Sequence, residues 1–219
     1  MKKKYIPVYY NNLEEKINII THAFGMFISI IALVLLILKS NSIGTIWHVF
    51  SFTVFGISLI VLYTASTFYH ASKKVKLRTR LNIFDHASIY VLIAGTYTPF
   101  TLVTLQGKIG WWIFGINWFL AITGIILKLF FTGKYDKLST LMYVLMGWII
   151  ILAIKPLINN LGYEGSLWLL IGGISYTIGA VFYSIPRIKY NHAIFHVFVL
   201  IGSFAHFISI YYYVILTKI

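Results

Sequence analysis

The fold is decided by the stretch at residues 192–216, HAIFHVFVLIGSFAHFISIYYYVIL. From Ala193 to Leu216 it is almost entirely apolar, and a helix needs about 20 such residues to cross a bilayer. His192 and His196 open this stretch four residues apart, so a helix places them on one face, about 6 Å apart along its axis. That spacing lets both imidazoles reach one divalent cation. The alternative is an interfacial pair that is hydrogen-bonded to water and backbone carbonyls, and the pair alone does not decide between them.

The composition of the whole chain is that of an integral membrane protein. Of its 219 residues, 59% are hydrophobic and 11% are charged, with a mean hydropathy of +0.86. A soluble domain would carry about 25% charged residues. The sequence predicts one membrane domain over residues 1–219. Because there is no cysteine, a metal site would rest on His, Asp and Glu side chains.

Seven apolar segments are long enough to span a bilayer. They lie at residues 17–38, 45–69, 85–105, 110–131, 138–157, 165–185 and 193–216. The predicted fold class is therefore an all-α membrane protein with seven transmembrane helices. We expect Lys155-Pro156 to end the fifth helix, because proline disrupts a helix interior.

The basic residues predict the orientation of these segments. The net charge of +13 could suggest a nucleic-acid partner, but the lysines and arginines lie in short loops, and we exclude that class of partner. Thirteen of them precede the first segment or follow the second, fourth and sixth, and four lie on the other side. Cytoplasmic loops carry the excess of Lys and Arg. The N-terminus is therefore expected in the cytoplasm and the C-terminus outside.

With this orientation, ionisable side chains from four segments gather near the cytoplasmic side, within about two helical turns of one depth. They are His22, His70, Asp85, His192 and His196. Ser66 shares the face of His70, one turn deeper. A carboxylate at the depth of Asp85 is costly unless it is paired or meets a cation. Its plain alternative is a helix N-cap, and capping is also the interpretation that we prefer for Glu14 and Glu15.

Three other histidines are placed elsewhere. His206 is fourteen residues beyond His192, about 21 Å along a helix, His48 begins its segment on the outer side, and His86 points about 100° away from Asp85. The histidines that remain with the right depth and facing are His70, His192 and His196. Three protein ligands leave a fourth position for water, which is the pattern of a catalytic zinc site.

These residues lie in a series of motifs. In chain order they are Glu15-x-x-Asn18-x-x-Thr21-His22, Ser66-x-x-x-His70, Asp85-His86-x-x-x-Tyr90, Ala94-Gly95-Thr96-Tyr97-Thr98-Pro99-Phe100 and His192-x-x-x-His196, with His206 beyond. Over essentially its whole length the chain resembles the haemolysin III family of bacterial membrane proteins, which belongs with the progestin and adipoQ (adiponectin) receptors and, more distantly, the alkaline ceramidases.

The resemblance implies a multi-pass protein of the bacterial cytoplasmic membrane with seven helices and a cytoplasmic N-terminus. It also implies a Zn²⁺ near the cytoplasmic side, held by His70, His192 and His196. Asp85 would contact the zinc-bound water, with Ser66 close by. His22 would make a contact behind the ligands or with substrate.

Two functions follow from such a site. The first is a zinc-dependent hydrolase of lipid amide or ester bonds, similar to ceramidases, with a membrane lipid as its substrate. In this function Asp85 would be the base, and Ser66 would donate a hydrogen bond to the substrate carbonyl. The second is a non-enzymatic regulator of membrane energetics or fluidity, in which a structural zinc holds the second and seventh helices together. A literal haemolysin is a third possibility, which we discount because the chain lacks the alternating pattern of a membrane β-barrel.

Overall fold

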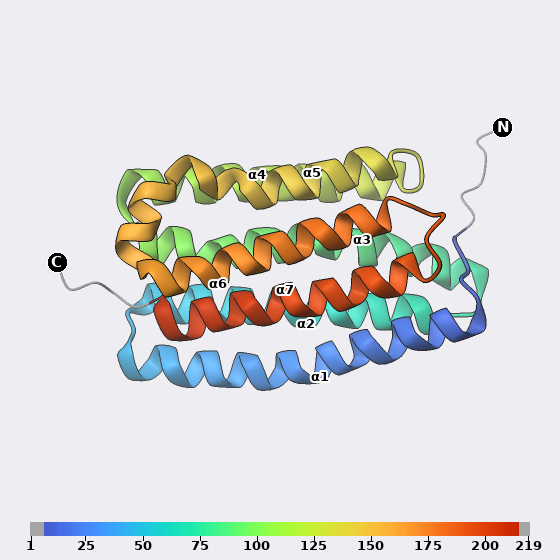
Figure 1. Ribbon diagram of the computed structural model, residues 1–219, viewed down its shortest axis with the longest axis horizontal. Coiled ribbons are helices and arrows are strands. Elements are labelled where there is room, and N and C mark those ends of the chain that lie inside the picture. Colours follow the sequence, from blue (N-terminus) through green and yellow to red (C-terminus); the bar gives the residue numbers. More distant parts are fainter. Residues whose placement is uncertain (1–6, 215–219) are drawn as a thin grey trace.

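The computed structural model describes residues 7–214, and all regular structure in that part of the chain is helical. The elements are α1 (Asn12–Ile43), α2 (Ile46–Ala71), α3 (Val75–Pro99), the π-helix η1 (Phe100–Leu105), α4 (Gly107–Phe131), α5 (Asp136–Trp148), the 3₁₀ helix η2 (Ile149–Ala153), α6 (Ile154–Tyr183) and α7 (Asn191–Tyr213). Figure 1 shows them side by side in an elongated bundle, with α1 beginning at one end and α7 ending at the other. We call these the proximal end and the distal end.

Six stretches of the described chain are long and apolar enough to cross a membrane. They are Asn12–Ser42, Ile46–Ala71, Val75–Leu105, Gly107–Phe131, Asp136–Tyr183 and Asn191–Tyr213. This confirms the predicted class of an all-α membrane protein. The fifth stretch, of 48 residues, contains two of the seven predicted segments.

The long fifth stretch is not one straight rod. Straight, 48 residues would extend about 72 Å, more than twice the roughly 30 Å hydrocarbon core. Gly162 interrupts the helical backbone at φ 78° and ψ 169°, a conformation that only glycine adopts readily. At the distal end the chain turns there, and the rest of α6 runs back toward the proximal end (Figure 1).

Contrary to the prediction from the sequence, Lys155-Pro156 does not end the fifth helix: regular α-helix stops before it, at Ile149, and the chain reverses after it, at Gly162. Pro156 falls in the first turn of α6, where a missing N–H costs no hydrogen bond. The α-helix instead gives way to η2 at Ile149. There the Tyr97 hydroxyl donates to the Gly147 carbonyl at 2.8 Å and accepts from the Ile150 N–H at 2.9 Å. A side chain from α3 thus satisfies backbone groups that the tightened turn releases.

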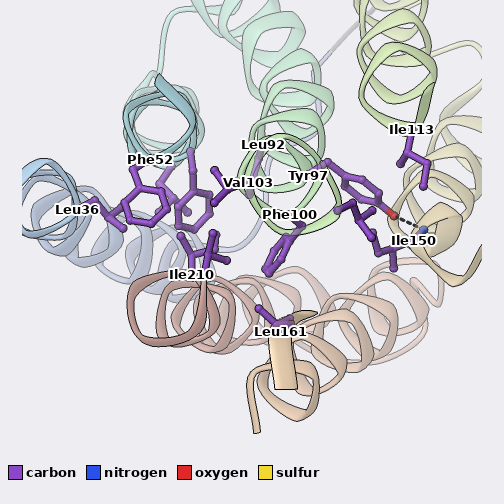
Figure 2. Packing of buried hydrophobic residues seen from close by; sticks show 14 of the residues in the cluster. Leu36, Phe52, Leu92, Tyr97, Phe100, Val103, Ile113, Ile150, Leu161 and Ile210 are labelled. Atoms are coloured by element: carbon purple, nitrogen blue, oxygen red, sulfur yellow. Dashed lines mark hydrogen bonds between the residues drawn. The ribbon is translucent and has the colours of Figure 1, made fainter. Parts of the chain in front are cut away.

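The outer surface of the bundle is apolar. Phe119, Phe130 and Leu152 expose 68%, 76% and 78% of their surface. Extensive exposure of large apolar side chains is unfavourable in water but not against lipid. The core also contains apolar side chains, which meet between the helices (Figure 2). Phe52 and Phe55 of α2 and Ile210 of α7 are fully buried in this cluster.

Candidate metal centre

Three buried histidines meet at the proximal end of the bundle. His70 lies in the last turn of α2, and His192 and His196 lie one turn apart at the start of α7. The Nε2 atom of His192 is 3.0 Å from Nε2 of His70 and 3.0 Å from Nε2 of His196. One ring nitrogen from each residue lies within 4.8 Å of the other two. The group could hold a metal ion, because three imidazoles point their nitrogens at one place.

The chemistry of this donor set fits a cation. His192 Nε2 faces two ring nitrogens, but a neutral imidazole nitrogen carries at most one proton and can donate to only one of them. An ion that accepts a lone pair from every ring removes this conflict. Nitrogens around tetrahedral zinc, at 2.0–2.1 Å from the ion, are about 3.3 Å apart. The two 3.0 Å separations lie close to that value.

Behind His70 lies an ion pair that links three helices. The Nδ1 atom of His70 is 2.7 Å from Oε2 of Glu15, in the first turn of α1. The other oxygen, Oε1, forms an ion pair with the guanidinium of Arg78 from α3. Arg78 exposes 2% of its surface. The pairing reduces the cost of a guanidinium removed from water.

The other two histidines are held by ring contacts. His22 stacks face to face on His196, with ring centroids 3.5 Å apart and planes 5° apart. Tyr10, which precedes α1, stacks on His192 at 4.7 Å and 21°. Burial raises the pKa of the Tyr10 phenol, so the ring stays neutral. Both contacts restrict the rotation of the imidazoles.

Asp85 and Ser66 face a cavity that begins at the histidines. The cavity is about 300 Å³, near the lower end of the range for ligand sites, and its walls are mostly apolar. His22, His192 and His196 line it at the proximal end, and His206 lines it further toward the distal end. The carboxylate of Asp85 is therefore available to a molecule in the cavity. Asp85 lies ten residues inside α3, so it is not an N-cap.

This chain is similar to known proteins along nearly its whole length. A family model described as "Haemolysin-III related" matches residues 10–207. The chain is 48% identical to "Hemolysin-3" of Bacillus cereus, over 93% of each chain. It is 46% identical to the "Hemolysin-3 homolog" of Bacillus subtilis, over 91% of this chain and 94% of that one. The chain belongs to the haemolysin III family.

Similarity extends beyond bacteria at lower identity. The human "Monocyte to macrophage differentiation factor" is 30% identical over 96% of this chain and 87% of its own length. The bacterial haemolysin III relatives, together with the six apolar helical stretches, make this chain a multi-pass protein of a bacterial plasma membrane.

In this haemolysin III protein the structure brings together the three histidines that the sequence placed at one depth. His206 is separate, with Nε2 3.2 Å from the carbonyl of Leu169. His48 forms part of the cap at the start of α2, at the opposite end of that helix from His70. His86, which the helical repeat placed about 100° away from Asp85, lines the same cavity as Asp85.

Sequence reasoning missed three residues around the site. Glu15 does lie in the first turn of α1, as a capping role requires, but its side chain contacts His70. The charge pattern indicates Arg78 only as one of the loop cations, and no motif contains Tyr10. The Glu15-x-x-Asn18-x-x-Thr21-His22 motif did contain a signal, because a helix carries its first, fourth and eighth positions on one face.

Proposed function

We propose that this haemolysin III protein binds Zn²⁺ through His70, His192 and His196 and hydrolyses an amide or ester bond of a membrane lipid. One observation carries the proposal. The three convergent histidine nitrogens, buried within the bundle, lie at the polar end of an apolar cavity that also exposes the Asp85 carboxylate. When bound, zinc supplies a Lewis acid that lowers the pKa of water to about 7.

The protein's own residues have distinct roles in this proposal. Asp85 accepts the proton of the attacking water and later delivers it to the leaving group. The Ser66 hydroxyl, which lies beside Asp85 in the cavity, donates to the substrate carbonyl oxygen as negative charge develops there. His22 fixes the plane of His196 through their stacked rings.

The shape and lining of the cavity favour a substrate with a hydrocarbon chain. Its apolar wall includes Leu92, Ile150 and Val199, and it continues to His206. Polar groups are concentrated at the histidine end. A lipid lying along the cavity would therefore present its first polar linkage, an amide or ester, beside Asp85. The resemblance to the alkaline ceramidases supports the same class of substrate.

The proposed topology has seven membrane crossings, with the N-terminus in the cytoplasm. The reversal at Gly162 divides Asp136–Tyr183 into two parts, each long enough to span. Seven crossings agree with α1 beginning and α7 ending at opposite ends (Figure 1). Eleven of the fourteen basic residues in the described chain belong to the proximal end, the side expected to face the cytoplasm. The histidine site would then lie near the cytoplasmic face.

A second candidate function is non-enzymatic, with zinc as a structural ion that holds helices together. The network around His70 favours it, because Glu15 and Arg78 join α1, α2 and α3 at the site. In that case the protein would influence membrane energetics or fluidity through its folded state, and the cavity would hold a lipid without reaction.

Metal analysis combined with a lipid-product screen tests the proposal. The purified protein, reconstituted with Zn²⁺ in vesicles that contain lipid amides and esters, is expected to release fatty acid. The matched control is His196→Ala, which removes one proposed ligand. Stoichiometric zinc without any released product from either lipid class would favour the non-enzymatic function with structural zinc. Absence of zinc would contradict both functions.

A further inference from the structure

The carboxylate of Glu15 is shared between a cation and a histidine. Oε1 pairs with Nη2 of Arg78 and also accepts from the Tyr10 N–H at 3.2 Å. Oε2 is 2.7 Å from Nδ1 of His70. A carboxylate can only accept hydrogen bonds. All three neighbours must therefore donate, and His70 must carry its proton on Nδ1.

Arg78 is held so that it presents one N–H to Glu15. Its Nε and Nη2 donate to the Val8 carbonyl at 3.1 and 2.9 Å. Its Nη1 lies 3.2–3.3 Å from the carbonyls of Tyr69, His70 and Ser72, which end α2. The guanidinium also lies over the rings of Tyr9 and Tyr69, 4.4 and 4.6 Å from their centroids. With so many fixed contacts, the guanidinium cannot rotate away from Glu15.

Only His70 of the three histidines has a carboxylate partner, whereas the ring of His196 meets the backbone carbonyl of Asn18. In the described part of the chain His192 Nδ1 has no hydrogen-bond partner, and His196 Nδ1 has the Thr21 hydroxyl at 3.5 Å. The amide of Asn18 also approaches His70 Nδ1, at 3.5 Å. That contact is at the limit of hydrogen bonding, and the 2.7 Å contact with a charged acceptor dominates.

We propose that Glu15, held by Arg78, is a positioning residue for the histidine group: it keeps the proton of His70 on Nδ1 and leaves the Nε2 lone pair free for a metal ion. The inference rests on the metal site of the proposed function, but not on hydrolysis. Ligand histidines commonly donate their second N–H to a carboxylate, and loss of that partner costs about 10–100-fold in metal affinity.

The substitution Glu15→Gln tests this idea because a glutamine cannot satisfy both neighbours in the same way. Its one oxygen accepts from Arg78, which can only donate, so its NH₂ group faces His70. His70 Nδ1 must then accept, and the ring proton moves to Nε2, where it blocks a metal ion. The side chain keeps its size, which limits the effect on packing.

The ¹⁵N resonances of the histidine rings report this tautomer directly in the metal-free protein. We expect His70, assigned by the signal that is lost in His70→Gln, to be protonated on Nδ1 in the wild type and on Nε2 in Glu15→Gln. Zinc affinity, measured by competition with a chelator, should fall about 10–100-fold. Asp136→Asn is the control, since it removes a carboxylate from the Lys128 ion pair and should change neither quantity.

If Glu15 had a purely structural role, Glu15→Gln would lower the unfolding temperature of the metal-free protein without moving the His70 proton. That result overturns the proposal, as does an Nε2-protonated His70 in the wild type, a measurement that does not require the variant to fold. A protein that binds no zinc overturns the metal site and this inference together. Zinc binding with the expected tautomers but no lipid turnover overturns hydrolysis alone and supports the role of Glu15.

Discussion

Replacing Asp85 by Asn is expected to leave zinc bound and to lower lipid turnover by about 10²–10⁴-fold, the usual cost of losing a general base. This corresponds to about 3–5 kcal/mol of transition-state stabilisation. The structure gives the reason for the two different outcomes. The group that could hold a metal contains the three histidines and no carboxylate, so Asp85 is not required for binding. Its carboxylate lines the cavity, and an amide of the same shape cannot take up a proton.

The assay measures zinc content and fatty-acid release on the same preparation of Asp85→Asn, beside the wild type and Asp136→Asn. The control carboxylate pairs with Lys128 at 2.9 Å and does not belong to the histidine group, so its zinc content should match the wild type. If Asp85 only orients water at a structural metal, zinc affinity itself should fall, by about 10–100-fold. If zinc and turnover are both unchanged, Asp85 has no part in the mechanism and most of the case for hydrolysis is lost.

The remaining predictions concern the metal ligands, the Tyr10 ring that stacks on His192, and the membrane topology. Replacing any one of the three proposed ligands by Ala should abolish the single zinc per chain, whereas His206→Ala should retain it; elemental analysis that finds full zinc in His196→Ala would contradict the assignment. Tyr10→Ala should speed the transfer of zinc to a chelator, because it removes the ring that stacks on His192. Tyr10→Phe keeps the ring and should behave as wild type. Equal transfer rates for the two variants would exclude a protective role for the Tyr10 ring. Reporter fusions should place the N-terminus in the cytoplasm and the C-terminus outside, and two ends on one side would mean that Asp136–Tyr183 does not cross twice.

The sequence alone predicted the membrane class, the family and the depth of the histidines. Apolar length is sufficient for the class, because no water is available in the bilayer core and the backbone must form helices there. The rise of 1.5 Å per residue converts position in a segment into depth. This is why the sequence could place His70 and His192 together although they are 122 residues apart, and could separate His206 from them.

Only the tertiary structure decided which way each side chain faces and where each helix changes course. A helical repeat fixes the angle between two residues of one helix, but the rotation of that helix against its neighbours depends on packing. The sequence therefore could not show that Glu15 points at His70, or that Arg78 is buried rather than a solvated loop cation. The same holds for the fifth stretch, where the Tyr97 hydroxyl from another helix accepts from the Ile150 N–H at the break that begins at Ile149. Contacts between distant segments selected these details, and local sequence patterns do not encode them.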